Sequence, residues 1–188
     1  MNYLADTNIL LRLVELQSAH HTEAKNAVDK LLKRGDTLYL LLQNVSEFWN
    51  VCTRPFDKNG LGFSIAETDA ELSKIEQVFD ILPDTLETYE NWRELVVKHS
   101  VLGVKVHDVK IVAAMKTHNI PKLLTFNAKD FKRFTEIEAV EPKDVQSFFE
   151  NSIKSHKLPY KSLKTATVPY SSTFGGRANS ISFATKSL

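Results

Sequence analysis

The sequence predicts an α/β protein with helices on both faces of a parallel β-sheet. Short apolar runs of strand length alternate along the chain with longer segments that have apolar residues at helical spacing. This alternation is typical of strand–helix–strand units, which build parallel sheets. Polar side chains also follow directly after the apolar runs, as at the carboxyl edge of an open sheet. We therefore expect a three-layer α/β/α arrangement around a sheet of four to five strands.

Four apolar runs are expected to form strands, at residues 2–5, 37–42, 122–126 and 136–140. The third run begins after Pro121, which restricts the preceding residue and so ends the helix before it. Residues 127–130 then form a polar corner that leads to another helix.

The helices are predicted from apolar spacing together with start and stop signals. Gly35 is a typical C-terminal stop, the pair Ser64 and Glu67 matches a capping box, and Pro142 is placed for the first turn of a last helix. Residues 56–63, which contain two glycines, are expected to form a loop. The predicted helices cover 9–16, 20–34, 44–54, 64–82, 85–99, 108–118 and a segment from 142.

Composition limits the cellular setting. No apolar run approaches the ~18 residues that a membrane-spanning helix needs, and Cys52 is the single cysteine of the chain, so it has no internal disulfide partner. An acidic residue at position 6 is not typical of a signal peptide. We expect a cytosolic protein without membrane contact.

Five polar side chains stand where predicted strands and helices meet. Asp6 follows the first strand, Glu47 lies one turn into the helix after the second, and Asn127 and Asp130 follow the third. Asp108 stands at the start of a helix. Because the carboxyl ends of parallel strands share one edge of the sheet, we expect these side chains to converge.

Helix capping is the alternative explanation for each of these positions, taken singly. Asn44-x-x-Glu47 matches a capping box, in which the glutamate reaches back to a free amide. The other possible caps or first-turn acids are Asp6 or Asn8, Asp108, and Asn127 with Asp130.

Taken together, the carboxylates indicate a metal site. Carboxylates that repel one another are costly unless a cation neutralises them. Mg²⁺ and Mn²⁺ prefer such oxygen ligands together with retained water. The chemistry that uses this arrangement is phosphodiester hydrolysis, in which the metal activates water and stabilises charge on phosphate.

Four stretches resemble the ordered motifs of PIN-domain nucleases, and most of all the VapC-type toxins of bacterial toxin–antitoxin pairs. The stretches are YLADTNIL, NVSEFWNV, VHDVKIVAAM and LLTFNAKDF. Each motif is weak alone, but four in the same order and spacing, within about residues 1–150, are specific. The resemblance implies a PIN-like fold and a Mg²⁺- or Mn²⁺-dependent endoribonuclease. It also implies a homodimer that a cognate antitoxin holds inactive.

The motif match also implies the site residues. Asp6, Glu47 and Asp108 take the positions of the family's acids, and Asn127 takes a position where many members have a fourth aspartate. This departure predicts one tight metal ion in the free enzyme, with Asp130 as the possible replacement ligand. The predicted substrate-binding residues are Asn8, Arg12 and Thr125. Further basic residues near the predicted cleft in sequence, which are otherwise ordinary surface, are Arg54, Lys105, Lys110 and Lys129.

Two other functions stay open at this point. One is a PIN nuclease directed at DNA, and the other is a PIN-like module that has lost catalysis and binds protein or RNA. The intact set of Asp6, Glu47 and Asp108 speaks against the second, whereas Asn127 leaves it open.

The chain is predicted to divide into a nuclease domain at 1–151 and a tail at 152–188. The tail carries six lysine and arginine residues and no acid, which leaves 18 basic against 23 acidic residues, a net charge of −5, on the domain. The tail has no sustained periodicity, so a flexible segment is expected. The alternative is an RNA-contacting arm, in which lysines meet phosphates and aromatic rings stack on bases.

Overall fold

The computed structural model of the chain describes residues 1–145, and the predicted tail lies outside them. Within these residues five strands pair in parallel in the order β3-β2-β1-β4-β5. This confirms the predicted α/β class and parallel sheet. The strands are β1 (Asn2–Ala5), β2 (Thr37–Leu41), β3 (Asp80–Leu82), β4 (Lys122–Leu124) and β5 (Glu138–Val140).

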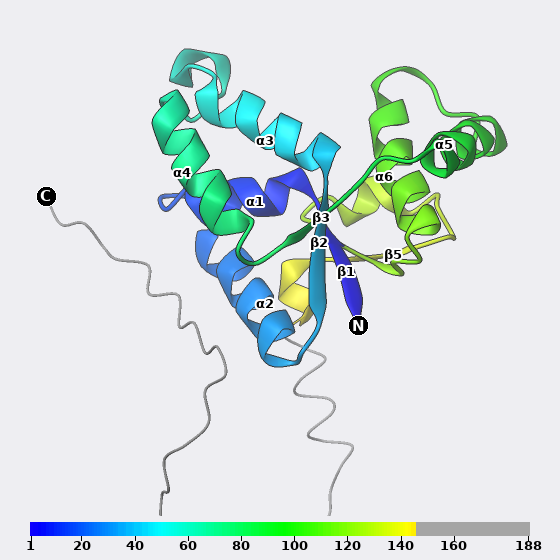
Figure 1. Cartoon of the computed structure of the whole chain (residues 1–188), viewed down its shortest axis with the longest axis horizontal. Coiled ribbons are helices and arrows are strands. Elements are labelled where there is room, and N and C mark those ends of the chain that lie inside the picture. The colour runs from blue at the N-terminus through cyan, green and yellow to red at the C-terminus, as the bar shows by residue number, and fades with distance from the viewer. Residues whose placement is uncertain (146–188) are drawn as a thin grey trace, which may run out of the picture. The chain divides into compact units, whose positions relative to one another are not determined.

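Helices cover both faces of the sheet, as Figure 1 shows. One face packs against α1 (Thr7–Val14), α2 (His21–Lys33), α3 (Leu42–Thr53) and α4 (Ile65–Ile75). The other face packs against α5 (Leu86–Lys98) and α6 (Val106–Thr117). Three short 3-10 helices complete the described elements: η1 (Phe56–Lys58), η2 (Gly103–Lys105) and η3 (Ala128–Phe131).

The two cores follow from the alternation of side chains along β1. Tyr3 and Ala5 point into the core formed with α1 to α4, whereas Leu4 points into the core formed with α5 and α6. Both faces of a central parallel strand are buried, so all three residues are apolar or aromatic. Cys52 on α3 belongs to the first of these cores, and its side chain is fully buried.

Helix α6 is apolar around most of its circumference because it lies between the sheet and α5. Its residues from Ile111 to Met115 are all buried, and so is Val109. A helix buried on several sides cannot shift easily. The side chain at its first turn, Asp108, is therefore carried on a firmly packed element.

The predicted helix over 64–82 is wrong in its second half. Helix α4 ends at Ile75, and residues 80–82 form the edge strand β3, which pairs with β2. The buried Phe79 anchors the turn between them. Backbone groups at the edge of β2 offer a hydrogen-bonded partner to residues 80–82, and such long-range pairing overrides local helical spacing.

Other boundaries differ by a few residues. Strand β4, predicted at 122–126, ends at Leu124, and β5, predicted at 136–140, begins at Glu138, so both strands are shorter than predicted. Helix α3 begins at Leu42 and α6 at Val106, two residues earlier than predicted in each case. The predicted loop at 56–63 contains η1, and the helix expected after the corner at 127–130 is only the single turn η3.

Three of the predicted local start and stop signals are confirmed. Ser64 Oγ accepts from the amide of Glu67, whose carboxylate accepts from the Ser64 amide at 2.8 Å. Gly35 has a φ of +77°, the left-handed conformation of a helix stop. Residues 142–145 are helical from Pro142 onward. In the part of the chain that the structure describes, no helix is long and apolar enough to span a membrane.

Glu136 joins the end of α5 to the segment before β5. Its carboxylate accepts from Lys98 Nζ at 2.6 Å and pairs with His99 Nε2 at 3.3 Å. Burial of the carboxyl acts to raise the pKa of Glu136, but hydrogen bonds from Lys98, from its own backbone amide and from His99 outweigh it and lower the pKa to about 2. The ionised form therefore stabilises the fold.

We expect Glu136→Gln to lower the free energy of unfolding at pH 7 by about 1–2 kcal/mol, because a charge-assisted hydrogen bond is lost while half-exposed Lys98 is screened by solvent. The contribution is complete above the ordinary glutamate pKa of 4.5 and is lost as the pH falls through that value toward 2. Urea unfolding of both proteins between pH 3 and 7 measures this. The difference between the two proteins should shrink below pH 4.

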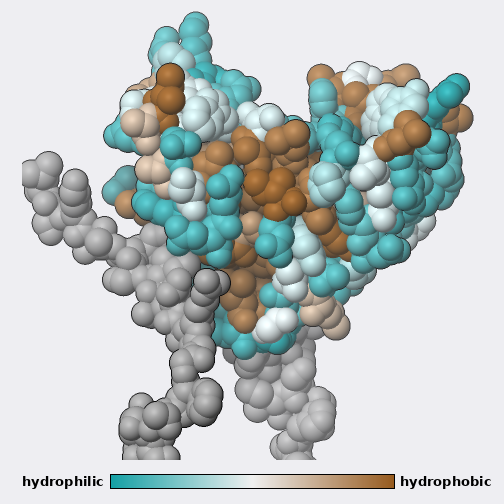
Figure 2. All heavy atoms as spheres, in the orientation of Figure 1, coloured by the Kyte–Doolittle hydropathy of each residue, from teal (hydrophilic) through white to brown (hydrophobic). Residues whose placement is uncertain are grey.

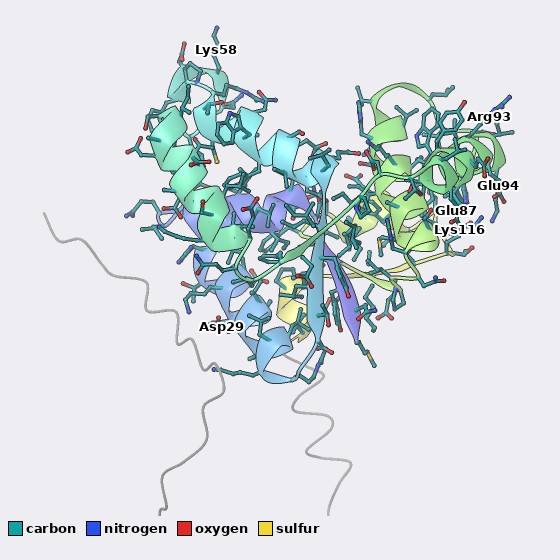
Figure 3. The ribbon with its side chains drawn as sticks, in the orientation of Figure 1. Asp29, Lys58, Glu87, Arg93, Glu94 and Lys116 are labelled. Atoms are coloured by element: carbon teal, nitrogen blue, oxygen red, sulfur yellow. The ribbon has the colours of Figure 1, made fainter. Side chains whose placement is uncertain are left out.

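Glu94→Gln is the matched control, since Glu94 pairs with Lys116 on the exposed side of α5 and α6, where Figure 3 labels both. It should change the unfolding free energy little at any pH. A difference for Glu136→Gln that stays constant from pH 3 to 7 would show that the ionised carboxylate is not the source.

Candidate active site

The candidate site lies where the connections of the sheet change direction. From β1 the chain proceeds outward to β2 and β3 on one side, and β4 and β5 fill the other side. Ligands of open α/β sheets bind at such a switch point, outside the carboxyl ends of the strands. Asp6 directly follows β1 and Thr125 directly follows β4, and the Asp6 amide donates to the Leu124 carbonyl at 3.0 Å.

Asp6 is buried and held by two neutral donors. Its Oδ2 accepts from Asn8 Nδ2 at 2.8 Å and from Thr125 Oγ1 at 2.7 Å. Asn8 is in turn fixed, because its Oδ1 accepts from the Phe126 amide at 3.1 Å. Asp6 occupies the N-cap position of α1, but its side chain makes no capping hydrogen bond. Helix capping therefore does not explain this carboxylate.

The surroundings of Asp6 disfavour its ionised form. Burial is the largest cause and raises the pKa of Asp6 to about 6, opposed by hydrogen bonds from Thr125 and from the Thr7 amide. The negative charges of Glu47 and Asp108 raise the pKa further. The three carboxylates therefore act on one another electrostatically, and a bound cation would relieve the cost of ionising them.

Glu47 faces the same side from α3. Its Oε2 accepts from Thr7 Oγ1 at 2.7 Å, and its Oε1 accepts from Gln43 Nε2 at 2.8 Å. The alternative explanation of Glu47 as part of a capping box with Asn44 does not hold, because α3 begins earlier and Asn44 Oδ1 itself accepts from the Leu41 amide at 2.9 Å. The Glu47 side chain therefore does not cap α3, and it lines the cleft described below.

Asp108 lies in the first turn of α6, and it is not the cap of that helix. Its Oδ2 lies 3.1 Å from Lys105 Nζ, and the same ammonium lies 3.1 Å from Asp130 Oδ1. Asp130 belongs to the single turn η3 after β4. Lys105 therefore joins two of the predicted acids across the site.

A cleft of about 370 Å³ contains most of the residues that the sequence singled out. All five residues predicted to offer oxygen ligands to a metal line this cleft, and so do Asn8 and Arg54. Its lining residues are Asp6, Thr7, Asn8, Leu11, Gln43, Glu47, Asn50, Val51, Arg54, His107, Asp108, Ile111, Asn127, Asp130 and Phe131.

Several predicted substrate contacts lie elsewhere. Arg12 pairs with Glu15 and is not among the lining residues. Thr125 is fully buried, and its hydroxyl is used by Asp6 and by the Asn127 amide. Lys110 pairs with Asp84 at 2.9 Å beside a different pocket. Lys129 lines an adjoining groove that shares Asn127 and Asp130 with the cleft.

The polar residues that position the acids were not predicted from the sequence. Thr7 Oγ1 donates to Glu47 and accepts from Asn44 Nδ2 at 3.2 Å, so it ties α1 to α3. Gln43 holds Glu47 and also donates to the His107 carbonyl at 3.4 Å. Thr7 adjoins Asp6 in the sequence, and Gln43 lies one helical turn before Glu47. Adjacency and i, i+4 spacing were therefore the available signals.

The fold and the cleft define an α/β protein with a carboxylate-lined site at the topological switch point. A sequence model of the PIN domain matches residues 3–137. The chain therefore belongs to the PIN domain family. Comparison with curated protein sequences gives no match.

Solved structures share the fold at low sequence identity. The chain is similar to VapBC2 from Rickettsia felis, bound to a promoter DNA fragment, with a TM-score of 0.60, 18% identity, and coverage of 75% of this chain and 98% of the other. It is also similar to VapBC-1 from nontypeable Haemophilus influenzae, with a TM-score of 0.55 and 16% identity; the match covers 76% of this chain and 99% of the other. A third similar structure is VapC20 from Mycobacterium tuberculosis, described as a toxin that cleaves the sarcin–ricin loop. Its TM-score is 0.52 and its identity 18%, and the match covers 68% of this chain and 92% of the other.

We expect Asp6→Asn to raise the melting temperature of the metal-free protein at pH 7, because burial penalises a neutral amide less than an ionised carboxylate. The pKa of Asp6 lies near 6 in the folded protein, above its ordinary value of 3.8. The penalty is therefore complete above pH 6 and vanishes as the pH falls toward 4. A shift of this size corresponds to at most roughly 3 kcal/mol. Calorimetric melting in EDTA at pH 4, 5, 6 and 7 measures it.

Asp29→Asn is the control, since Asp29, which Figure 3 labels, pairs with Lys25 on the surface of α2. It should move the melting temperature little, and by the same amount at each pH. If Asp6→Asn lowers stability at pH 7 in EDTA, then burial of Asp6 is not a cost to the folded protein.

Proposed function

We propose that the protein is a divalent-metal-dependent endoribonuclease and the toxin of a toxin–antitoxin pair. The observation that carries this proposal is the convergence of Asp6, Glu47, Asp108 and Asn127 on one cleft at the switch point of a PIN fold. Membership of the PIN family supports a nuclease that uses a divalent metal. The similar solved structures include VapC20, which is described as a toxin that cleaves the sarcin–ricin loop.

The donor set fits a hard dication. Carboxylate and amide oxygens line the cleft, and these are the ligands that Mg²⁺ and Mn²⁺ prefer. Among residues 1–145 no three acidic, histidine or cysteine side chains already stand in a metal-binding arrangement. Asp6 and Asp108 are the direct ligands in our proposal, and Glu47 and Asn127 would hold metal-bound water or complete the ligand set. The mutual repulsion recorded at Asp6 fits a site that a cation completes.

When bound, the metal would lower the pKa of a water and stabilise the charge that develops on the scissile phosphate. The chain's own residues do the rest. Thr125 and Asn8 hold Asp6 in one orientation, and Thr7 and Gln43 hold Glu47 in one orientation. Glu47 lines the cleft and would accept a proton from the attacking water, and Arg54 lines the same cleft and would contact a phosphate there.

An antitoxin and a second copy of the chain are the proposed partners. Several of the similar structures are toxin–antitoxin complexes. Helix α5 exposes apolar side chains, with Leu86 and Val97 each 74% exposed. Figure 2 shows further hydrophobic surface gathered between the two groups of helices, and Ile81 of the edge strand β3 is 41% exposed. Exposed apolar area of this kind is typical of protein interfaces.

Asp108→Asn and Glu47→Gln should each lower RNA cleavage at least about 100-fold, because losing one group of a metal site costs several kcal/mol of transition-state stabilisation. The assay uses purified protein, Mn²⁺ and matched RNA and DNA oligonucleotides, with EDTA as a second condition. Glu94→Gln should cleave like the wild type. Cleavage that continues in excess EDTA would contradict the metal requirement, and cleavage of DNA alone would favour a DNA-directed nuclease.

Asn127→Asp should tighten Mn²⁺ binding to the free protein by about tenfold, which is 1.4 kcal/mol, because a charged ligand replaces a neutral one. Calorimetric titration should give one tight site in the wild type. Two tight sites in the wild type, with one lost in Asp130→Asn, would identify Asp130 as the fourth ligand instead of Asn127.

Co-expression with any small protein that is encoded directly beside this gene tests the proposed antitoxin. We expect a stable complex whose RNA cleavage is suppressed, and light scattering of the toxin alone should show a dimer. A complex that cleaves RNA as fast as the isolated chain would contradict this assignment.

A further inference from the structure

Lys105 stands between two acids of the proposed metal site. Its ammonium lies 3.1 Å from Asp108 Oδ2 and 3.1 Å from Asp130 Oδ1. Both acids line the cleft, one from the first turn of α6 and the other from η3. One positive charge thus bridges carboxylates from two separate elements of the cleft, and one of them, Asp108, would be a metal ligand in our proposal.

We propose that Lys105 is an internal competitor of the divalent metal, a latch that must leave Asp108 before a metal ion can bind there. This inference rests on the proposed function, since it concerns the same site. Asp108 Oδ2 cannot offer its charge fully to a hard cation while the Lys105 ammonium lies 3.1 Å from it in an ion pair. The positive charge beside it also repels a second cation.

The latch is placed to open at low cost. Side chains of Lys105 and Asp130 are 43% and 45% exposed, and ion pairs with this exposure contribute only about 0–1 kcal/mol. Lys105 ends a 3-10 turn that begins at Gly103, where φ is +59°. Leu102 and Val104 of this segment are 84% and 79% exposed, so neither side chain packs against the core. A divalent ion carries twice the charge and can displace the ammonium.

The arrangement also accounts for an asymmetry between the two aspartates. Asp6 is buried and makes no ion pair within the described residues, so its ionised form is penalised. Asp108 has Lys105 as a partner before any metal arrives. The metal-free protein therefore keeps one half of its acidic cleft neutralised, at the expense of metal affinity.

The test compares Mn²⁺ affinity of the EDTA-stripped, RNA-free wild type and Lys105→Met by calorimetric titration. Met keeps most of the side-chain volume and removes the charge. We expect about tenfold tighter binding, and Lys105→Arg should stay close to the wild type because it keeps the charge. Lys110→Met is the matched control: Lys110 also pairs with an aspartate, Asp84, but beside another pocket. It should leave the affinity unchanged.

Melting curves give a second readout. In EDTA, Lys105→Met should melt no higher than the wild type, and saturating Mn²⁺ should raise its melting temperature by more than it raises that of the wild type. If Lys105→Met does not fold, Lys105→Gln takes its place in both measurements. Equal Mn²⁺ affinity for the wild type and the neutral variant overturns the latch.

The remaining outcomes separate the latch from the nuclease assignment. Unchanged Mn²⁺ affinity with weaker RNA binding would make Lys105 a phosphate contact and overturn the latch. Tighter Mn²⁺ binding without any cleavage by the wild type would support the latch and contradict the nuclease. If neither wild type nor variants bind Mn²⁺, the metal site itself is overturned, and the latch with it.

Discussion

The hydrogen bond from Thr125 to Asp6 is the interaction on which the site depends. It joins the residues that follow β1 and β4, across the point where the sheet changes direction. This hydrogen bond stabilises the carboxylate of Asp6, which is buried at the carboxyl edge of the sheet, although burial still raises the pKa of Asp6. Asn8 adds a second donor and closes the connection to β4 through the Phe126 amide. A polar network of this kind is stable only when each member is satisfied.

From this fixed carboxylate the rest of the site follows by packing. Thr7, the next residue, positions Glu47 on α3, and the buried helix α6 presents Asp108 from the opposite face of the sheet. Two layers of helices thus contribute one acid each to an edge that β1 supplies with a third. The sheet is rigid because both faces are covered, so the distances between these acids are set by backbone packing instead of by flexible loops.

Charge balance links stability to the proposed function. Three carboxylates in one cleft cost free energy when no cation is present, and the protein divides that cost between a raised pKa at Asp6 and an ammonium partner at Asp108. A functional site that is destabilising in its empty state is a common compromise. It also explains why Asp6→Asn, a substitution at a proposed metal ligand, is expected to stabilise the metal-free fold.

The sequence by itself determined the parallel α/β fold, the family, and the residues Asp6, Glu47, Asp108 and Asn127 that reach one cleft, because strand-end position and motif order are local properties of the chain. It did not determine β3, since that strand exists only through pairing with β2. Nor did it show that Thr125 holds Asp6, or that Lys105 bridges Asp108 and Asp130. These contacts join residues that are distant in sequence or that lie on separate short elements. They depend on how the helices pack on the sheet, so only the tertiary structure decided them.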